Sequence, residues 1–308
     1  MRAVVMRSYG GPEVLRVEEI ERPEPLPTEV LVRVRAIGTN PVDTYVRSGA
    51  FPILKPPAIL GWDISGVVEE VSPGVNRFRC GDEVFGMPLF PRAAGAYAEY
   101  VAAPARQLAR KPAGLDHVQA ASLSLAGLTA WQALVDAADV QPGQRVLIHA
   151  AGGGVGHLAV QIAKARGAHV IATTSRPKHE FVRSLGADEI VDYRGTDFTT
   201  AVKDVDVAFD LVAGEYGPRT LQVLRPGGLL VTIDRANAAL AARAAAMGRR
   251  FAGMIVEPDQ VGLQGLAELV DNGRLRVHVD QVLPLEEAPR AHALYARGGV
   301  TGKIALTT

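Results

Sequence analysis

The segment from Arg145 to Ser175 constrains the fold more than any other part of the chain. It reads RVLIHA, AGGGVG, HLAVQIAKARGA and HVIATTS, which is an apolar run, a glycine-rich turn, a helical pattern and a second apolar run. This order predicts a strand, a tight turn, a helix and a second, parallel strand. On the G-x-G-x-x-G template of dinucleotide-binding turns, the aligned positions are Ala151, Gly153 and Gly156, so alanine replaces the first glycine.

The glycine turn suits a pyrophosphate for physical reasons. Gly153 lets backbone N–H groups approach the phosphates, the start of the helix adds partial positive charge, and Gly156 lets the helix pack closely on the strand. We therefore expect cofactor contacts along the whole turn, at Ala151, Gly152, Gly153, Gly154, Val155 and Gly156. A tight connection between a strand and a helix, without any ligand, is the alternative interpretation.

The second strand of this unit ends without an acidic residue. In NAD-binding units, an Asp or Glu at this point accepts hydrogen bonds from the ribose 2′-OH. This chain has Thr174, Ser175 and Arg176 there, followed by Lys178. Hydroxyl, guanidinium and ammonium groups bind a 2′-phosphate through charge-assisted hydrogen bonds. The pattern therefore predicts NADP(H) as the cofactor; the alternative is that Arg176 and Lys178 belong to a solvated helix start.

The remainder of the chain shows two different patterns of apolar residues. Up to about Pro112, short alternating stretches such as EVLVRVRAIG are separated by proline and glycine, which predicts a half-buried antiparallel β domain. Beyond that point, apolar runs alternate with amphipathic helical patterns, which predicts an α/β fold with a doubly wound parallel sheet. The tail carries strand patterns at LRVHVDQVLPL and KIALTT, so it is able to return to the first domain and make that domain discontinuous.

Composition excludes several classes of protein. A length of 308 residues with 48% hydrophobic content is typical of about two globular domains. The 33 basic and 33 acidic residues balance, so no overall field favours nucleic acid or an anionic membrane. No apolar run reaches the length of a membrane span or a secretory signal, and we expect a soluble cytoplasmic protein. The single cysteine, Cys80, excludes an intramolecular disulfide and a multi-cysteine zinc site.

Motifs spread over the whole chain resemble one enzyme superfamily. They are NPVDTYVRSG, GWDISGVVEEVSPGV, GAYAEYV, GLTAWQAL, AAGGGVG, LGADEIVDY, LRPGG and RGGVTGKIAL. Together they are similar to zinc-independent medium-chain dehydrogenase/reductases, in particular to the NADPH-dependent quinone oxidoreductases. The resemblance implies a discontinuous GroES-like catalytic domain over residues 1–118 and 258–308. It also implies a Rossmann NADP(H)-binding domain over residues 119–257, with a small substrate entering between the two.

The resemblance also implies specific cofactor contacts. The family's serine, lysine and tyrosine around the 2′-phosphate match Ser175, Lys178 and Tyr193. Lys303, in GVTGKIAL, is expected as a further cofactor contact.

Catalytic candidates follow from the same resemblance. The segment NPVDTY is similar to the family's active-site loop and contributes Asn40, Asp43 and Tyr45, while Thr129 in GLTAW resembles a position near the nicotinamide. Asn40 and Asp43 equally suit the capping of a turn. Thr129 equally suits a hydrogen bond to the preceding helical turn. Phe51 stands where several relatives carry a tyrosine as proton donor, so no acid is assigned at that point.

Zinc ligands are missing from the positions where zinc-dependent relatives carry them. Those relatives have a cysteine after the third strand and a Gly-His-Glu motif further on. Here IGTNPVD contains no cysteine, and Trp62 and Asp63 replace the His and Glu. Catalytic zinc needs three protein ligands in tetrahedral arrangement. We therefore expect no metal, and we assign no ligand role to the scattered histidines, His149, His169, His278 and His292.

These observations favour direct hydride transfer from NADPH to a quinone or enone, with no metal and no covalent intermediate. The quinol or enolate oxygen that results is a weaker base than an alkoxide, so neutral hydrogen-bond donors can stabilise it. Reduction of enoyl thioesters is one alternative, and a cofactor-binding protein without significant turnover is another. The strand-like RRFAGMIVEP is expected at an exposed sheet edge, which predicts a homodimer.

Overall fold

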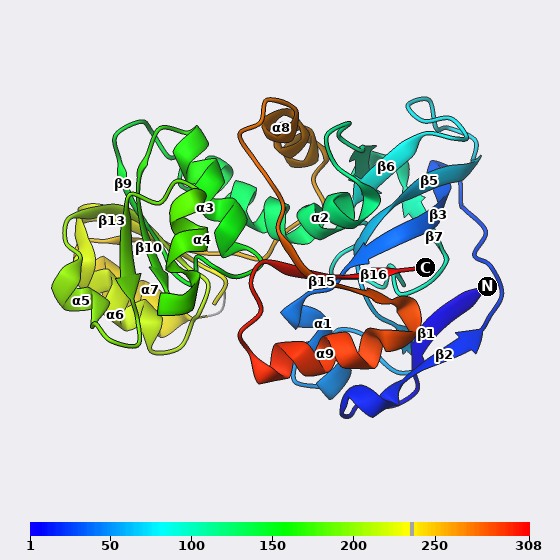
Figure 1. Cartoon of the computed structure of the whole chain (residues 1–308), viewed down its shortest axis with the longest axis horizontal. Helices are drawn as coiled ribbons and strands as arrows, with labels where there is room; N and C mark the ends of the chain where they lie inside the picture. Colours follow the sequence, from blue (N-terminus) through cyan, green and yellow to red (C-terminus); the bar gives the residue numbers. More distant parts are fainter. Residues whose placement is uncertain (235–236) are drawn as a thin grey trace. The chain divides into compact units, whose positions relative to one another are not determined.

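The chain forms two units in a computed structural model that describes residues 1–234 and 237–308. The first unit comprises Met1–Leu128, Glu257–Gly273 and Val277–Thr308 (Figure 1). The second comprises Thr129–Val256 and Arg274–Arg276. The first unit is therefore discontinuous, with the tail joined to the N-terminal part.

The second unit contains a six-stranded sheet in which every pair of neighbours is parallel. The strand order is β11-β10-β9-β12-β13-β14, so the chain starts in the middle and winds outward in both directions. This is the doubly wound Rossmann order predicted from the alternation of apolar runs and helical patterns. The strands are β9 (Arg145–Ile148), β10 (His169–Thr174), β11 (Glu189–Asp192), β12 (Val205–Asp210), β13 (Leu224–Thr232) and β14 (Arg250–Gly253).

Helices cover this sheet because each parallel strand needs a crossover connection. Helix α3 packs on β9 and β10, α6 packs on β12 and β13, and α7 packs on β14 (Figure 1). The apolar core beneath them includes Leu147, Ile171, Phe198, Leu221 and Leu230. The helices are α3 (Gly156–Ala165), α4 (His179–Ser184), α5 (Phe198–Ala201), α6 (Tyr216–Val223) and α7 (Ala238–Ala246).

The first unit is built on two sheets. A seven-stranded sheet runs β15-β16-β3-β5-β6-β8, with β7 also paired to β3, and a three-stranded sheet runs β2-β1-β4. The strands of the larger sheet are β3 (Glu29–Gly38), β5 (Asp63–Val71), β6 (Glu83–Gly86), β7 (Tyr100–Pro104), β8 (Leu108–Arg110), β15 (Val279–Pro284) and β16 (Lys303–Thr307). Those of the smaller sheet are β1 (Arg2–Met6), β2 (Leu15–Glu19) and β4 (Ala58–Ile59).

The C-terminal strand closes the first unit. Strand β16 pairs antiparallel with β3, where Ala305 lies opposite Gly38 and Thr307 opposite Ala36. The return of the tail to the first domain, which the sequence left open, is confirmed by this pairing. It also carries Lys303, at the start of β16, to the end of β3.

Four helices accompany the sheets of the first unit. They are α1 (Pro41–Ser48), α2 (His117–Trp131), α8 (Gln260–Asp271) and α9 (Ala288–Arg297). Helix α2 continues into a π-helical segment, Gln132–Ala137. Among the described residues, the stretch His117–Ala137 alone is long and apolar enough to cross a membrane, and 72% of its apolar window is buried within the protein. A core helix of a globular unit has the same properties.

The division between the units falls inside α2. We expected this boundary after residue 118, beyond the strand patterns of the first domain, but it lies after Leu128. The first turns of α2 belong to the first unit because the N–H of Leu125 donates to Asp63 Oδ1 at 2.8 Å. The segment Arg274–Arg276 belongs to the second unit, where the side chain of Gln161 bonds both the N–H and the carbonyl of Arg276, at 3.0 and 2.9 Å.

Candidate active site

The glycine turn connects β9 to α3 at the carboxyl edge of the parallel sheet. The strand order reverses between β9 and β12, and this is the edge at which open α/β sheets bind ligands. A Cβ at Gly156 would lie 2.3 Å from the carbonyl oxygen of Ala150, so only glycine lets α3 begin this close to the strand. The N–H of Ala151 donates to the carbonyl of Thr173 at 3.0 Å, which ties the turn to β10. The close packing predicted for Gly156 is confirmed.

His149, at the end of β9, supports the turn from within the sheet. Its Nδ1 lies 3.0 Å from Thr173 Oγ1, and its Nε2 lies 3.0 Å from Thr220 Oγ1. Burial lowers the pKa of His149 to about 3, so the ring is neutral at physiological pH. Both nitrogens have hydroxyl partners, which leaves this histidine a structural part of the turn.

The residues predicted around a 2′-phosphate lie at the ends of two neighbouring strands. Ser175 and Lys178 follow β10 directly, and Tyr193 follows β11. The N–H of Tyr193 donates to the carbonyl of Thr174 at 3.4 Å, and the Tyr193 side chain is 42% exposed. The side chain of Thr174, by contrast, is buried. The strand ends therefore present Ser175, Lys178 and Tyr193 together, whereas the hydroxyl of Thr174 faces the protein.

A further cation at this edge was not predicted from the sequence. The guanidinium carbon of Arg194 lies 5.8 Å from the centroid of the Tyr193 ring. Arg176 is exposed at the start of the 3₁₀ helix Arg176–Lys178, which follows β10. The sequence could have pointed to Arg194, because this residue directly follows Tyr193, the tyrosine that the family resemblance singled out. The segments that follow the paired strands β10 and β11 thus carry three cationic residues, Arg176, Lys178 and Arg194.

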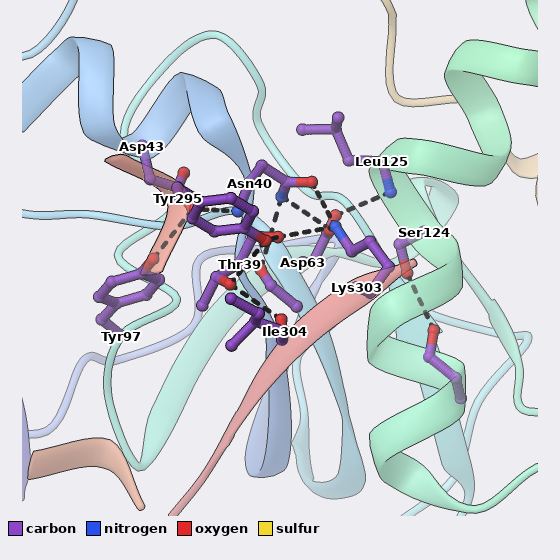
Figure 2. Close-up of polar contacts among 12 residues, drawn as sticks. Thr39, Asn40, Asp43, Asp63, Tyr97, Ser124, Leu125, Tyr295, Lys303 and Ile304 are labelled. Atoms are coloured by element: carbon purple, nitrogen blue, oxygen red, sulfur yellow. Dashed lines mark hydrogen bonds and ion pairs between the residues drawn. The ribbon is translucent and has the colours of Figure 1, made fainter. Parts of the chain in front are cut away.

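The first unit contains a buried polar group formed by Asn40, Asp63 and Lys303, which we call the Asp63 cluster. Figure 2 shows the three side chains pointing toward one another from the start of α1, from β5 and from β16. The amide nitrogen of Asn40 donates to Asp63 Oδ2 at 2.9 Å, and the ammonium of Lys303 donates to Asn40 Oδ1. Lys303 Nζ also lies 3.7 Å from Asp63 Oδ2. Each side chain is therefore held by the other two.

Backbone groups complete the Asp63 cluster. Lys303 Nζ donates to the carbonyl of Thr39 at 2.7 Å, and the N–H of Leu125 donates to Asp63 Oδ1 at 2.8 Å. Burial raises the pKa of Asp63 to about 6, while the Lys303 ammonium acts to lower it. Burial lowers the pKa of Lys303, against the attraction of Asp63 and Asp43. The pair exists because each ion compensates the desolvation of the other.

Asp43 belongs to a second buried network next to this cluster. Its Oδ2 accepts from the N–H of Asn40 at 2.8 Å and from the hydroxyl of Tyr97 at 2.9 Å. The Tyr97 hydroxyl also lies 3.1 Å from Nε2 of His292. Burial raises the pKa of Asp43 to about 7. The carboxyl group thus connects α1 to the loop that carries Tyr97 and, through it, to α9.

These contacts give Asn40, Asp43 and Lys303 partners within the protein, while the catalytic and cofactor roles expected for them stay predictions. Asn40 is 3% exposed, and its amide nitrogen bonds Asp63 and, at 3.5 Å, the carbonyl of Gly38. Asn40 begins α1 as its N-cap and Asp43 binds the Asn40 N–H, so the capping alternative describes both residues. Lys303 is 2% exposed, and its ammonium bonds the carbonyl of Thr39 and the side chain of Asn40 inside the first unit.

Tyr45, on the same helix as Asp43, has a side chain that is 57% exposed. Phe51 lies beside it, since the N–H of Phe51 donates to the carbonyl of Tyr45 at 3.0 Å. Thr129, in the last turn of α2, is buried within the second unit. Of the four predicted catalytic residues, Tyr45 alone presents its side chain to solvent.

Trp62 and Asp63, which stand at the positions of the zinc motif, bond to other parts of the protein. The indole N–H of Trp62 donates to the carbonyl of Arg92 at 2.7 Å, and Asp63 is bonded as described above. Outside residues 235–236, no group of three or more His, Cys, Asp or Glu side chains is arranged to hold a metal ion. His169 lies 2.7 Å from Glu189 and His292 bonds Tyr97, so both have protein partners.

Several members of these networks were missed at the sequence level. Tyr97 and His292 are 195 residues apart in the chain, and Tyr295 reaches the carbonyl of Thr39 across 256 residues. No local pattern relates such positions. From the sequence, His292 was noted only as one of the scattered histidines, and Asp63 only for its place in the motif of zinc-dependent relatives.

Two family models match the chain. Residues 26–113 match the model described as alcohol dehydrogenase GroES-like domain, and residues 185–306 match the model described as zinc-binding dehydrogenase. The quinone oxidoreductase of Pseudomonas aeruginosa is 35% identical to the chain, with 99% of each sequence covered.

Solved structures are similar over the full length. The quinone oxidoreductase from Coxiella burnetii has a TM-score of 0.95 and 36% identity, covering 100% of this chain and 99% of its own. An NAD-dependent alcohol dehydrogenase has a TM-score of 0.92 and 38% identity, with complete coverage of both chains. Escherichia coli quinone oxidoreductase complexed with NADPH has a TM-score of 0.91 and 30% identity, again with complete coverage of both.

Proposed function

Since the chain belongs to the quinone oxidoreductase family of the medium-chain dehydrogenase/reductases, we propose that it is an NADPH-dependent, zinc-independent reductase of quinones or conjugated enones. The observation that carries the cofactor assignment is the end of β10. There Ser175, Lys178 and Tyr193 gather beside the glycine turn, and no acidic residue lies between Thr174 and Lys178. The NADPH complex of the Escherichia coli relative supports the same assignment.

The residues of the second unit fit NADPH in two parts. The turn from Ala151 to Gly156 and the start of α3 are suited to the pyrophosphate, because the glycines keep side chains away from the backbone N–H groups. Ser175, Lys178 and Tyr193 are suited to the 2′-phosphate as hydroxyl and ammonium donors. Bound NADPH supplies a hydride from C4 of its nicotinamide ring.

The acceptor class follows from the donors that the chain provides. Trp62 and Asp63 stand in the zinc motif, the Trp62 indole bonds Arg92, and Asp63 is bonded to Asn40 and Leu125, which supports a reductase that works without zinc. Reduction must then place negative charge on an oxygen that neutral donors can stabilise. A quinol or enolate oxygen meets this condition better than a simple alkoxide, and the exposed Tyr45 hydroxyl is our proposed donor.

A panel of acceptors tests this function. The purified protein is given NADPH or NADH in the presence of EDTA, with 1,4-benzoquinone, 9,10-phenanthrenequinone, a simple enone or crotonyl-CoA. We expect NADPH oxidation with a quinone or enone, unaffected by the chelator. Turnover confined to crotonyl-CoA would favour an enoyl thioester reductase. Oxidation of ethanol or benzyl alcohol without reduction of any quinone or enone would overturn the proposal.

Lys178→Ala tests the cofactor assignment. A charge-assisted contact to the 2′-phosphate contributes about 1.5–3 kcal/mol, so we expect the Kd of NADPH to rise about tenfold or more. The Kd of NADH is expected to stay nearly constant, because NADH carries no 2′-phosphate. Both constants are measured by fluorescence titration. Equal weakening of both cofactors would show that Lys178 does not bind the 2′-phosphate.

We also propose that the protein is a cytoplasmic homodimer. In the part of the chain that the structure describes, strand β14 pairs with β13 alone and forms one edge of the six-stranded sheet, where the sequence predicted an edge strand. Ile255 follows it with an exposed side chain, so the edge offers both unpaired backbone and apolar surface to a second copy. Analytical ultracentrifugation at micromolar concentration is expected to give a dimer, and a monomer would contradict this assembly.

A further inference from the structure

Gly152 lies in the glycine turn directly beneath the side chain of Lys178. A Cβ built on Gly152 would lie 2.7 Å from Lys178 Cδ, 3.3 Å from Lys178 Cβ and 3.0 Å from Thr174 Oγ1. The ammonium of Lys178 donates to the carbonyl of Gly152 at 3.5 Å. The aliphatic part of Lys178 therefore crosses the turn at the point where Gly152 lacks a side chain.

The backbone does not by itself require glycine at position 152. Its φ angle lies outside the left-handed region, in contrast with Gly143 on one side and Gly167 on the other. An alanine is therefore compatible with the backbone of the turn. What it would meet are side chains, one of them the middle of a flexible lysine and the other a buried threonine.

The lysine is the partner that must move. Thr174 is buried at the end of β10, where its strand pairs with β11, so its hydroxyl has little freedom. Lys178 has four rotatable side-chain bonds and is half-buried, so a methyl group at position 152 would displace its stem and its ammonium with it.

We infer that Gly152 is a positioning residue that sets the preference for NADPH over NADH by letting Lys178 cross the turn. The inference rests on the proposed use of NADPH. It adds that the glycines of the turn have different roles in binding the cofactor. Gly153 and Gly156 serve contacts common to both cofactors, close approach to the pyrophosphate and close helix packing. Gly152 serves the 2′-phosphate alone, through the position of Lys178.

The test is a double-mutant cycle on cofactor binding, without any acceptor. Gly152→Ala is made in the wild type and in Lys178→Ala, and the Kd values of NADPH and NADH are measured by titration calorimetry. In the wild-type background we expect Gly152→Ala to raise the Kd of NADPH by about tenfold and to change that of NADH by less than about twofold. In the Lys178→Ala background, the same change is expected to leave the ratio of the two constants unaltered.

Two fragments of the cofactor distinguish an effect on the 2′-phosphate from an effect on the pyrophosphate. Adenosine 2′,5′-bisphosphate and adenosine 5′-monophosphate both lack the pyrophosphate and differ in the 2′-phosphate. Gly152→Ala is expected to weaken the first and to spare the second. The matched control is Gly153→Ala, whose Cβ would approach only the carbonyl of Ala150, at 3.2 Å. It is expected to weaken NADPH and NADH alike.

Two results would overturn the inference. One is equal loss of NADPH and NADH affinity in Gly152→Ala, which would assign this glycine to the pyrophosphate. The other is a selective loss of NADPH that persists in the Lys178→Ala background, which would remove the lysine from the mechanism. A wild type that binds neither cofactor would instead contradict the proposed function itself, so the two failures are distinguishable. Retained NADH affinity shows that the turn of the variant is folded.

Discussion

Replacing Asp63 with alanine is expected to lower the free energy of unfolding by about 3–5 kcal/mol, because it leaves the Lys303 ammonium buried without its counter-ion. The same change removes the acceptors of the Asn40 amide and of the Leu125 N–H. Asp63 thus holds β5, α1, α2 and β16 together at one point. Urea denaturation, followed by tryptophan fluorescence and by circular dichroism, measures the loss.

Two further variants separate the charge from the packing. In Asp63→Asn/Lys303→Met the buried ions are removed together, and most of the lost stability is expected to return. Glu18→Ala is the control, since Glu18 forms an ion pair with the exposed Arg7 at 2.6 Å on the surface. Its unfolding midpoint is expected to stay near that of the wild type. A loss in Asp63→Ala no larger than in Glu18→Ala would refute the structural role of the cluster.

Tyr45→Phe is expected to lower kcat with a quinone or enone by about 10²-fold, the typical cost of removing one donor to a developing oxyanion. The Kd of NADPH is expected to remain unchanged, because Tyr45 lies in the first unit and the cofactor residues lie in the second. Stopped-flow measurement of hydride transfer, together with fluorescence titration of NADPH, distinguishes the two effects.

Tyr9→Phe is the matched control for this variant. Tyr9 is also partly exposed, but its hydroxyl donates to the carbonyl of Leu54 at 2.9 Å and is directed into the protein. We expect kcat to stay close to the wild-type value in this variant. If Tyr45→Phe also keeps wild-type kcat, the donor is not Tyr45, and Thr129 becomes the candidate to test. Asn40→Ala is expected to lower the free energy of unfolding, because the side chain bonds both Asp63 and Lys303.

The residues proposed to bind the cofactor were predicted from the local sequence. The turn from Ala151 to Gly156 depends on glycines next to an apolar strand and a helix, and all three elements lie within about two dozen residues. The absence of an acid after Thr174 is likewise a local fact. Local signals also predicted the edge strand β14, because an apolar stretch after the last crossover has only one place in a doubly wound sheet.

The roles of Asn40, Asp43 and Lys303 were not readable in the same way. The segment NPVDTY is equally consistent with a catalytic loop and with a capped helix start, and the choice depends on what faces it. The decisive partner is Lys303, which lies 263 residues further along the chain and reaches Asn40 through the pairing of β16 with β3. The ammonium of Lys303 and the carboxylate of Asp63 bond the two ends of the Asn40 amide, which adds a structural contact that the local sequence does not predict.

By itself, the sequence determined the parallel sheet, the glycine turn and the absence of an acid after β10, because period, glycine spacing and residue type act over short distances along the chain. Tertiary structure alone decided which polar side chains are buried and which are exposed. Asp63 and Lys303 are buried because distant strands enclose them, whereas Tyr45, two residues after the buried Asp43, is 57% exposed. The constraint on Gly152 has the same origin, since it comes from the path of the Lys178 side chain and not from the backbone.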